Sequence, residues 1–161
     1  MSGPAIDVYL APGELLVSPR GVQVRTVLGS CVAVCLWDPA RARGGLNHFL
    51  LPRPGPQDGA DFRFGTVATA ALVQRLCRGG SRPGDLAAAV VGGGHPHGAL
   101  KSTVGDENVA AALAVLREHG VTVGRQDTGG PYGRRVLFHT GTGVLTVQRL
   151  RRWGAVAVEP T

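Results

Sequence analysis

The chain of 161 residues has few aromatic or charged side chains and no long apolar run. Charged residues make up 17% and apolar residues 43%, a balance that excludes a disordered chain and a coiled coil. Uninterrupted apolar stretches such as 31–37 and 109–116 are far shorter than the ~20 residues of a membrane-spanning helix. The segment 1–12 lacks Lys, Arg and an apolar core, so it does not resemble a secretory signal. We therefore expect no membrane insertion.

The sequence also lacks internal repeats and a recognisable linker. A chain of this length buries roughly two-thirds of its unfolded surface around one core. We expect a single domain over residues 1–161, with 154–161 as a flexible tail.

The charge balance is basic, with 17 Lys and Arg against 11 Asp and Glu, a net charge of +6 and a pI of about 10.2. This charge would attract an acidic partner, although arginine-rich coding explains it equally well, because every basic residue except Lys101 is Arg. Aromatic residues make up only 5% and do not alternate with the basic clusters, so we expect no nucleic-acid surface. An odd number of cysteines, three, without a secretory signal indicates free thiols in a reducing compartment, which is the cytoplasm.

Hydrophobic patterns predict two helices, over residues 62–78 and 107–119, each followed by glycine. Strands are predicted over 14–18, 22–28, 31–37, 45–51, 86–91, 121–125, 135–139 and 144–150, with 14–18 and 22–28 as one hairpin and the last two as another. These elements indicate an α/β fold: a single layered domain in which two main helices cover a largely antiparallel sheet.

The first stretch that could carry chemistry is Gly29-Ser30-Cys31, followed by His48. If residues 31–37 and 42–48 form a hairpin with 38–41 as its loop, Trp37 faces Ala42 and Cys31 faces His48. Directly opposed side chains on one sheet face lie about 4.5 to 5.5 Å apart at Cβ. A slip of one residue would place the two side chains on opposite faces.

A Cys beside a His is a candidate catalytic dyad, because an imidazolium lowers the pKa of the thiol from about 8.5 and favours the nucleophilic thiolate. Backbone amides after Gly29 could stabilise an oxyanion there. From spacing alone, the alternative stays open that Cys31 is a small buried apolar residue and His48 a structural sheet histidine.

The other cysteines, the glycine-rich loop and its histidines give weaker evidence for a functional site. Cys35 is about 13 Å along the strand from Cys31, too far for a disulfide, and the two lack zinc-finger spacing. Cys77 is interpreted as a packing residue. The loop from Gly92 and Gly93 to Gly98 fails the dinucleotide-binding pattern and is interpreted either as a flexible loop or as a rim of the site. His95 and His97 have no acidic or cysteine partner nearby in sequence, so we expect no metal site.

At these residues the sequence resembles the CheD family of chemoreceptor glutamine deamidases. The resemblance rests on 13–14, the run 26–36 (Thr-Val-Leu-Gly-Ser-Cys-Val-Ala-Val-Cys-Leu), 48–52, 92–93, 104–105 with Asn108, 127–130 with 133–134, and 142–143. It implies a layered α/β fold similar to bacterial deamidating toxins. It also implies a Cys nucleophile, a His base and a Thr that orients the imidazole, which correspond here to Cys31, His48 and Thr26. Gly29, Ser30, Gly92 and Gly93 are then candidates for the oxyanion site or the substrate rim.

The implied reaction converts glutamine side chains of chemotaxis receptors to glutamate through a thioester, with release of ammonia and without metal or other cofactor. The resemblance also implies the cytoplasmic regions of methyl-accepting chemotaxis receptors as partners, regulation by a CheC-type phosphatase and, in some members, receptor methylesterase activity. A non-catalytic adaptor that binds receptors or CheC is the second function class, and a transglutaminase is a third.

Overall fold

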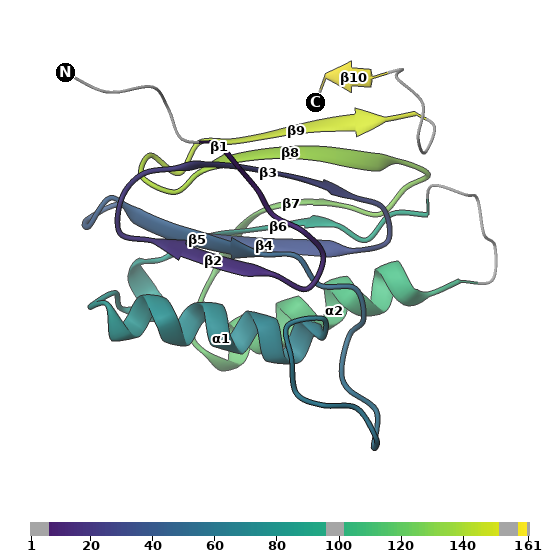
Figure 1. Cartoon of the computed structure of the whole chain (residues 1–161), viewed down its shortest axis with the longest axis horizontal. Coiled ribbons are helices and arrows are strands. Elements are labelled where there is room, and N and C mark those ends of the chain that lie inside the picture. Colours follow the sequence, from purple (N-terminus) through teal and green to yellow (C-terminus); the bar gives the residue numbers. More distant parts are fainter. Residues whose placement is uncertain (1–6, 96–101, 152–157, 161) are drawn as a thin grey trace.

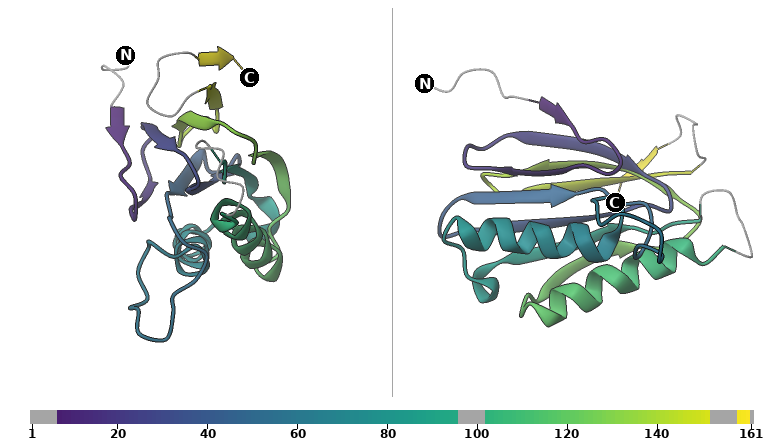
Figure 2. Two further views of the ribbon diagram at one scale, coloured as in Figure 1. Left: turned by 90° about the vertical axis from the view of Figure 1, so that its right-hand side faces the viewer. Right: turned by 60° about the horizontal axis from the view of Figure 1, so that its bottom comes forward.

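The computed structural model describes residues 7–95, 102–151 and 158–160, and it shows three layers (Figure 1). One sheet forms the outer layer, a second sheet lies in the middle, and two helices cover the far face of the second sheet (Figures 1 and 2). The predicted α/β layered fold is confirmed, with one addition: the strands form two stacked sheets, where one sheet was expected.

Both sheets have five strands. The outer sheet has the order β1-β3-β8-β9-β10, and the middle sheet has the order β2-β5-β4-β6-β7. The strands are β1 (Asp7–Tyr9), β2 (Leu15–Ser18), β3 (Gln23–Leu28), β4 (Val32–Asp38), β5 (Arg43–Asn47), β6 (Ala87–Gly92), β7 (Val123–Thr128), β8 (Gly133–His139), β9 (Leu145–Leu150) and β10 (Val158–Pro160). The helices are α1 (Gly65–Arg78), the short 3₁₀ turn η1 (Pro83–Asp85) and α2 (Val104–Glu118).

The predicted hairpin of β2 and β3 is wrong, whereas the predicted hairpin of β8 and β9 is confirmed. Although β2 and β3 are consecutive, β2 pairs with β5 in the middle sheet and β3 pairs with β8 in the outer sheet. A turn with Pro and Gly shows that the chain changes direction, but it does not show in which sheet the next strand lies. This crossing brings β3 over the middle sheet, where the candidate site forms.

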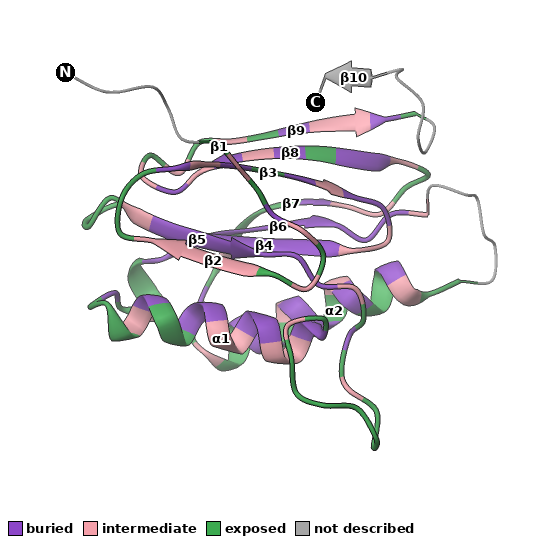
Figure 3. Cartoon of the chain, in the orientation of Figure 1, coloured by how far each residue is buried: buried purple, intermediate pink, exposed green. Residues whose placement is uncertain are grey.

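Alternation along β4 explains why this strand is almost wholly apolar. Val32, Val34 and Leu36 pack toward α1 and α2, whereas Cys35 and Trp37 face the outer sheet. β4 is thus covered on both faces, as its continuous apolar run predicts. In Figure 3 most residues of β4, β5 and β6 are coloured as buried, while the connection from β5 to α1 is largely exposed.

The β4–β5 hairpin differs from the expected register by two residues. Trp37 pairs with Gly44 and Asp38 with Arg43, so the loop covers residues 39–42. The Asp38 carboxylate accepts hydrogen bonds from the backbone N–H groups of Ala40 and Arg41, at 3.0 and 3.3 Å, and so starts the turn from the last strand residue. Because the shift is even, every side chain of β5 keeps its predicted face.

No helix in the described part of the chain is long and apolar enough to cross a membrane. In the segment 154–161, expected as a tail, Val158–Pro160 form β10 and pair with β9; residues 154–157 and 161 lie outside the described residues.

Candidate active site

Two residues of the expected catalytic group, Thr26 and His48, are in contact between the two sheets, and the third, Cys31, faces the same layer. Cys31 immediately precedes β4 and packs against the inter-sheet cluster that includes Leu28 and Val91. His48 follows β5 in the same sheet, and Thr26 comes from β3 of the facing sheet. The site is therefore assembled from both sheets.

Cys31 and His48 are diagonal neighbours, where the sequence predicted direct opposition. Val32 and Phe49 exchange backbone hydrogen bonds of 3.1 and 2.9 Å, which extends the β4–β5 register beyond β5. Continuing this register places Leu50 opposite Cys31 and His48 opposite Ala33. Diagonal neighbours on one face are about 7–8 Å apart, and no hydrogen bond joins the Cys31 thiol to Nε2 of His48.

Thr26 and the Leu10 carbonyl determine which nitrogen of His48 carries the proton. The Thr26 hydroxyl lies 2.8 Å from the Leu10 oxygen and 2.7 Å from Nδ1 of His48. A hydroxyl has one proton, and the Leu10 oxygen can only accept, so Thr26 donates to Leu10 and accepts from Nδ1–H of His48. The neutral ring therefore keeps its lone pair on Nε2, which is buried and has no hydrogen-bond partner in the described part of the chain. A buried free lone pair at this position suits a general base.

Burial changes the resting charges from those expected. It lowers the pKa of His48 to about 4, and the Leu10 carbonyl and the charge of Glu14 offset this only in part. Burial also raises the pKa of the Cys31 thiol, which its own backbone N–H partly offsets. The resting site therefore holds a neutral thiol and a neutral imidazole, where the sequence led us to expect a thiolate beside an imidazolium.

The predicted oxyanion and rim residues separate into two groups. In the described part of the chain, the backbone N–H groups of Gly29, Ser30 and Cys31 have no carbonyl partner. The N–H of Gly93 is already used, because it donates to the Cys31 carbonyl at 2.9 Å. The backbone N–H groups next to Cys31 are thus without a carbonyl partner in the described part of the chain, whereas the Gly92–Gly93 loop supports Cys31 through a hydrogen bond to its carbonyl.

The loop at Gly92 and Gly93 requires glycine. Both residues have positive φ, 112° and 64°, which L side chains rarely adopt. A Cβ at Gly92 would also collide with the Cys31 carbonyl oxygen. A side chain at Gly92 would therefore displace the backbone at Cys31.

A buried ion pair holds this loop in place. Arg134 of β8 is only 1% exposed and donates to Asp127 at 2.9 Å and to the Gly129 carbonyl at 2.7 Å. The Gly129 N–H in turn donates to the Gly92 carbonyl at 3.0 Å. The two glycine loops behind Cys31 are thus joined through one buried arginine.

Asn108 of α2 is a second buried polar residue behind Cys31. Its side-chain amide donates to the Ser30 carbonyl at 3.0 Å and to the Leu50 carbonyl at 2.9 Å. Neither Asn108 nor Arg134 was assigned a role from the sequence. Both lie at positions that face the core. Asn108 is on the same helix face as Ala112 and Val115, and Arg134 is on the same strand face as Val136 and Phe138. A polar residue among apolar core-facing positions is the sequence signal that could have identified both residues.

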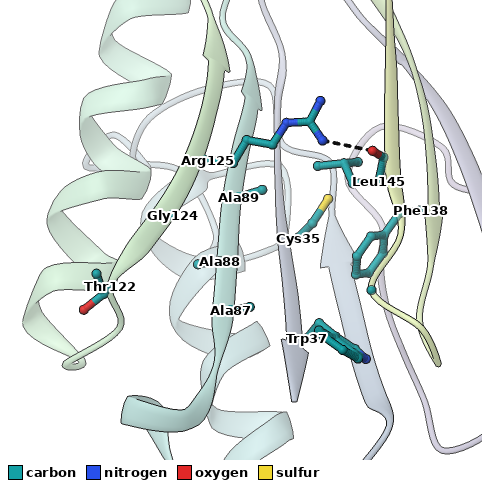
Figure 4. Close-up of a pocket in the computed structure, with 11 residues that line it drawn as sticks. Cys35, Trp37, Ala87, Ala88, Ala89, Thr122, Gly124, Arg125, Phe138 and Leu145 are labelled. Atoms are coloured by element: carbon teal, nitrogen blue, oxygen red, sulfur yellow. Dashed lines mark hydrogen bonds between the residues drawn. The ribbon is translucent and has the colours of Figure 1, made fainter. Parts of the chain in front are cut away.

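The remaining cysteines lie away from this site. Cys35 lines an inter-sheet hollow of about 280 Å³ with Trp37, residues 87–89 of β6 and Phe138 of β8 (Figure 4). Arg125 spans this hollow and donates to the Leu145 carbonyl at 2.9 Å. Burial raises the pKa of Cys35 to about 12, so its thiol stays protonated. Cys77 in α1 is half-buried.

His95 lies beside Asp106, with Nε2 3.2 Å from the carboxylate oxygen, and His97 lies outside the described residues. Within residues 7–95 and 102–151, no three His, Cys, Asp or Glu side chains are grouped so that they could share a metal ion.

Comparison with known proteins adds independent evidence. Residues 50–149 match the family model described as CheD chemotactic sensory transduction. Over 150 residues, 92% of this chain and 87% of the other, the chain is 43% identical to a protein of Anaeromyxobacter dehalogenans named "Probable chemoreceptor glutamine deamidase CheD 1". It is 44% identical over 146 residues, 88% of this chain and 77% of the other, to a protein of a Caulobacter species named "Probable chemoreceptor glutamine deamidase CheD".

Among solved structures, the crystal structure of the Bacillus licheniformis hypothetical protein YfiH matches with a TM-score of 0.51 and 16% identity, over 73% of this chain and 51% of that one. At this identity the likeness concerns the fold alone. Because the family model covers more than half of the chain and the relatives align over most of both chains, the chain belongs to the CheD family.

Proposed function

We propose that this protein is a protein-glutamine deamidase that converts glutamine side chains of chemotaxis receptors to glutamate, in the adaptation of chemotaxis. The names of its relatives support the substrate and the reaction. The observation that carries the chemistry is the free, buried Nε2 lone pair of His48 on the sheet face that it shares with Cys31.

In the proposed mechanism, Cys31 is the nucleophile and His48 the base. As the thiol attacks the glutamine carboxamide carbon, its proton passes to Nε2 of His48 and the carbonyl electrons move to the oxygen. The imidazolium then donates this proton to the departing nitrogen, which leaves as ammonia, and a thioester remains.

Hydrolysis of the thioester completes the cycle. His48 takes a proton from water, the hydroxide attacks the thioester carbon, and the proton returns to the sulfur as the glutamate product leaves. Thr26 holds the imidazole in the tautomer that both steps require. These steps need no metal or organic cofactor.

The proposal extends to partners and location. The substrate is the cytoplasmic region of methyl-accepting chemotaxis receptors, so we place the enzyme in the cytoplasm. The net charge of +6 suits an acidic receptor surface. A CheC-type phosphatase is the proposed regulator, because the sequence resembles a family that such phosphatases regulate; co-purification with CheC tests this point separately.

The test is intact-mass analysis of a purified receptor cytoplasmic fragment after incubation with the protein. Deamidation raises the mass by the difference between OH and NH₂ for each glutamine and releases ammonia. Loss of methyl groups would show methylesterase activity, a cross-linked product would show a transglutaminase, and co-elution without mass change would show an adaptor. Any of these last three results without deamidation would overturn the proposed reaction.

A further inference from the structure

Asn108 is a fully buried polar residue for which the mechanism above has no use. It lies on α2 with buried neighbours such as Gly105, Ala111 and Ala112. A buried amide destabilises the fold unless its hydrogen bonds are made. The Nδ2 group of Asn108 donates two, both to backbone carbonyls, whereas its Oδ1 is buried without a partner in the described part of the chain. The positions of these two carbonyls indicate the role of Asn108.

Both carbonyls lie next to the nucleophile. Ser30 directly precedes Cys31, and Leu50 lies across from Cys31 in the β4–β5 register. By donating to Ser30 at 3.0 Å and to Leu50 at 2.9 Å, Asn108 joins the two chain segments at the level of Cys31. On the other side, the Gly93 N–H holds the Cys31 carbonyl at 2.9 Å. The peptide groups before and after Cys31 are therefore both anchored.

The anchor before Cys31 also fixes the direction of an N–H group. The Ser30–Cys31 peptide is trans, so its C=O and N–H point in opposite directions. With the Ser30 carbonyl held by Asn108, the Cys31 N–H points away from α2. This N–H lies beside the Cys31 sulfur and has no carbonyl partner in the described part of the chain.

We propose that Asn108 is a positioning residue: it holds the Ser30 carbonyl so that the Cys31 N–H donates to the oxyanion formed when the sulfur attacks the substrate. The inference rests on the proposed deamidation for its substrate. The carbonyl of that substrate bonds to the sulfur, so its oxygen comes within reach of the adjacent N–H. The hydrogen bond from Asn108 also polarises the peptide and strengthens the N–H as a donor.

The first test compares Asn108→Leu, which keeps the size and removes both donors, with Ser81→Ala as a matched control. Ser81 makes a buried 2.6 Å hydrogen bond to Asp38, at the far end of β4. In Asn108→Leu, we expect kcat for ammonia release from a receptor fragment to fall about 10- to 100-fold, with KM within about threefold, because the donor acts in the transition state. Ser81→Ala should lose stability and keep kcat. An Asn108→Leu enzyme with wild-type kcat would overturn the proposal.

The second test needs no receptor. Iodoacetamide labelling of Cys31, followed by peptide mapping across pH, reports the N–H beside the sulfur, since this N–H also stabilises the thiolate. We expect Asn108→Leu to be labelled about threefold more slowly near neutral pH and to have its midpoint at higher pH. Ser81→Ala should follow the wild-type profile. Labelling that is equal in Asn108→Leu and wild type contradicts the proposed orientation.

The two tests separate this inference from the proposed function. If the wild-type protein releases no ammonia from receptor fragments, the deamidase proposal fails, while the labelling comparison still decides the role of Asn108. Should Asn108→Leu not fold, Asn108→Ala removes the same donors in a smaller side chain and is measured in the same two ways.

Discussion

Two cysteines on one strand face have opposite surroundings. Cys31 and Cys35 both point from the β4 segment toward the outer sheet, four residues apart. Cys31 shares its sheet face with His48, and the backbone N–H groups of residues 29–31 have no carbonyl partner in the described part of the chain. Cys35 lines a largely apolar hollow, where burial raises its pKa to about 12 (Figure 4).

The comparison shows that a place on this face of the sheet does not by itself make a cysteine thiol reactive. Burial raises the pKa of both thiols, so the position of each thiol in the sheet favours the protonated form. Both cysteines share a sheet face with His48, whose Nε2 has no hydrogen-bond partner in the described part of the chain, but free backbone N–H groups adjoin Cys31, whereas Cys35 lies among apolar side chains. The following predictions test whether this base and its support account for the contrast.

The largest effect is expected from the nucleophile itself. Cys31→Ser should lower deamidation at least about 10³-fold with little change in the unfolding midpoint, because the volume is nearly kept. Cys35→Ala is the matched variant and should keep activity while losing about 1 kcal/mol of stability. Ammonia release and thermal unfolding measure the two. Substantial turnover by Cys31→Ser would remove the distinction between the cysteines.

His48→Ala should be nearly as damaging as Cys31→Ser. Residues that act as one unit are not additive, so the double variant should be little worse than either single variant. The kcat of the three variants forms a double-mutant cycle. Losses that multiply would show that Cys31 and His48 work independently.

Acid should weaken the fold through His48. Its pKa is about 4 in the folded protein and about 6.5 in the unfolded chain, so only the unfolded state gains the proton between these values. This contribution to stability is complete above pH 6.5 and is lost as the pH falls to 4, a change of about 3 kcal/mol. Urea unfolding at several pH values should show that His48→Gln lacks this component and that His119→Gln keeps it. A pH-independent difference between wild type and His48→Gln would contradict a buried neutral imidazole.

A smaller effect is expected at Thr26. Thr26→Val keeps the shape but removes the acceptor for Nδ1–H, so the imidazole loses its fixed tautomer and kcat should fall about 10- to 100-fold. Thr69→Val is the control, because the Thr69 hydroxyl is buried in α1 and has no hydrogen-bond partner among the described residues. Steady-state kinetics compare the two variants. Equal activity would show that Thr26 does not orient His48.

Much of this arrangement could be predicted from the sequence. The apolar run of β4 and the helix periodicities predicted the layered fold. The spacing of Cys31 and His48 in the sequence predicted that both lie on one face of the sheet. The register error came from Asp38, whose side chain starts the turn within the last strand residue. The contact between Thr26 and His48 could not be derived from local patterns, because it depends on the crossing from β2 to the other sheet. The directions of the pKa shifts of Cys31 and His48 could not be predicted either, because they depend on burial in the folded state.

The division of the site between two sheets has a consequence for protein synthesis. Thr26, Cys31 and His48 leave the ribosome early, but β8, which pairs with Thr26 in β3, comes more than eighty residues after His48. Arg134, which secures the loop behind Cys31, arrives with that same strand. Domains generally fold as units once their parts are available. A nascent chain therefore carries these three side chains without their working geometry, and the site can assemble only after β8 has been synthesised.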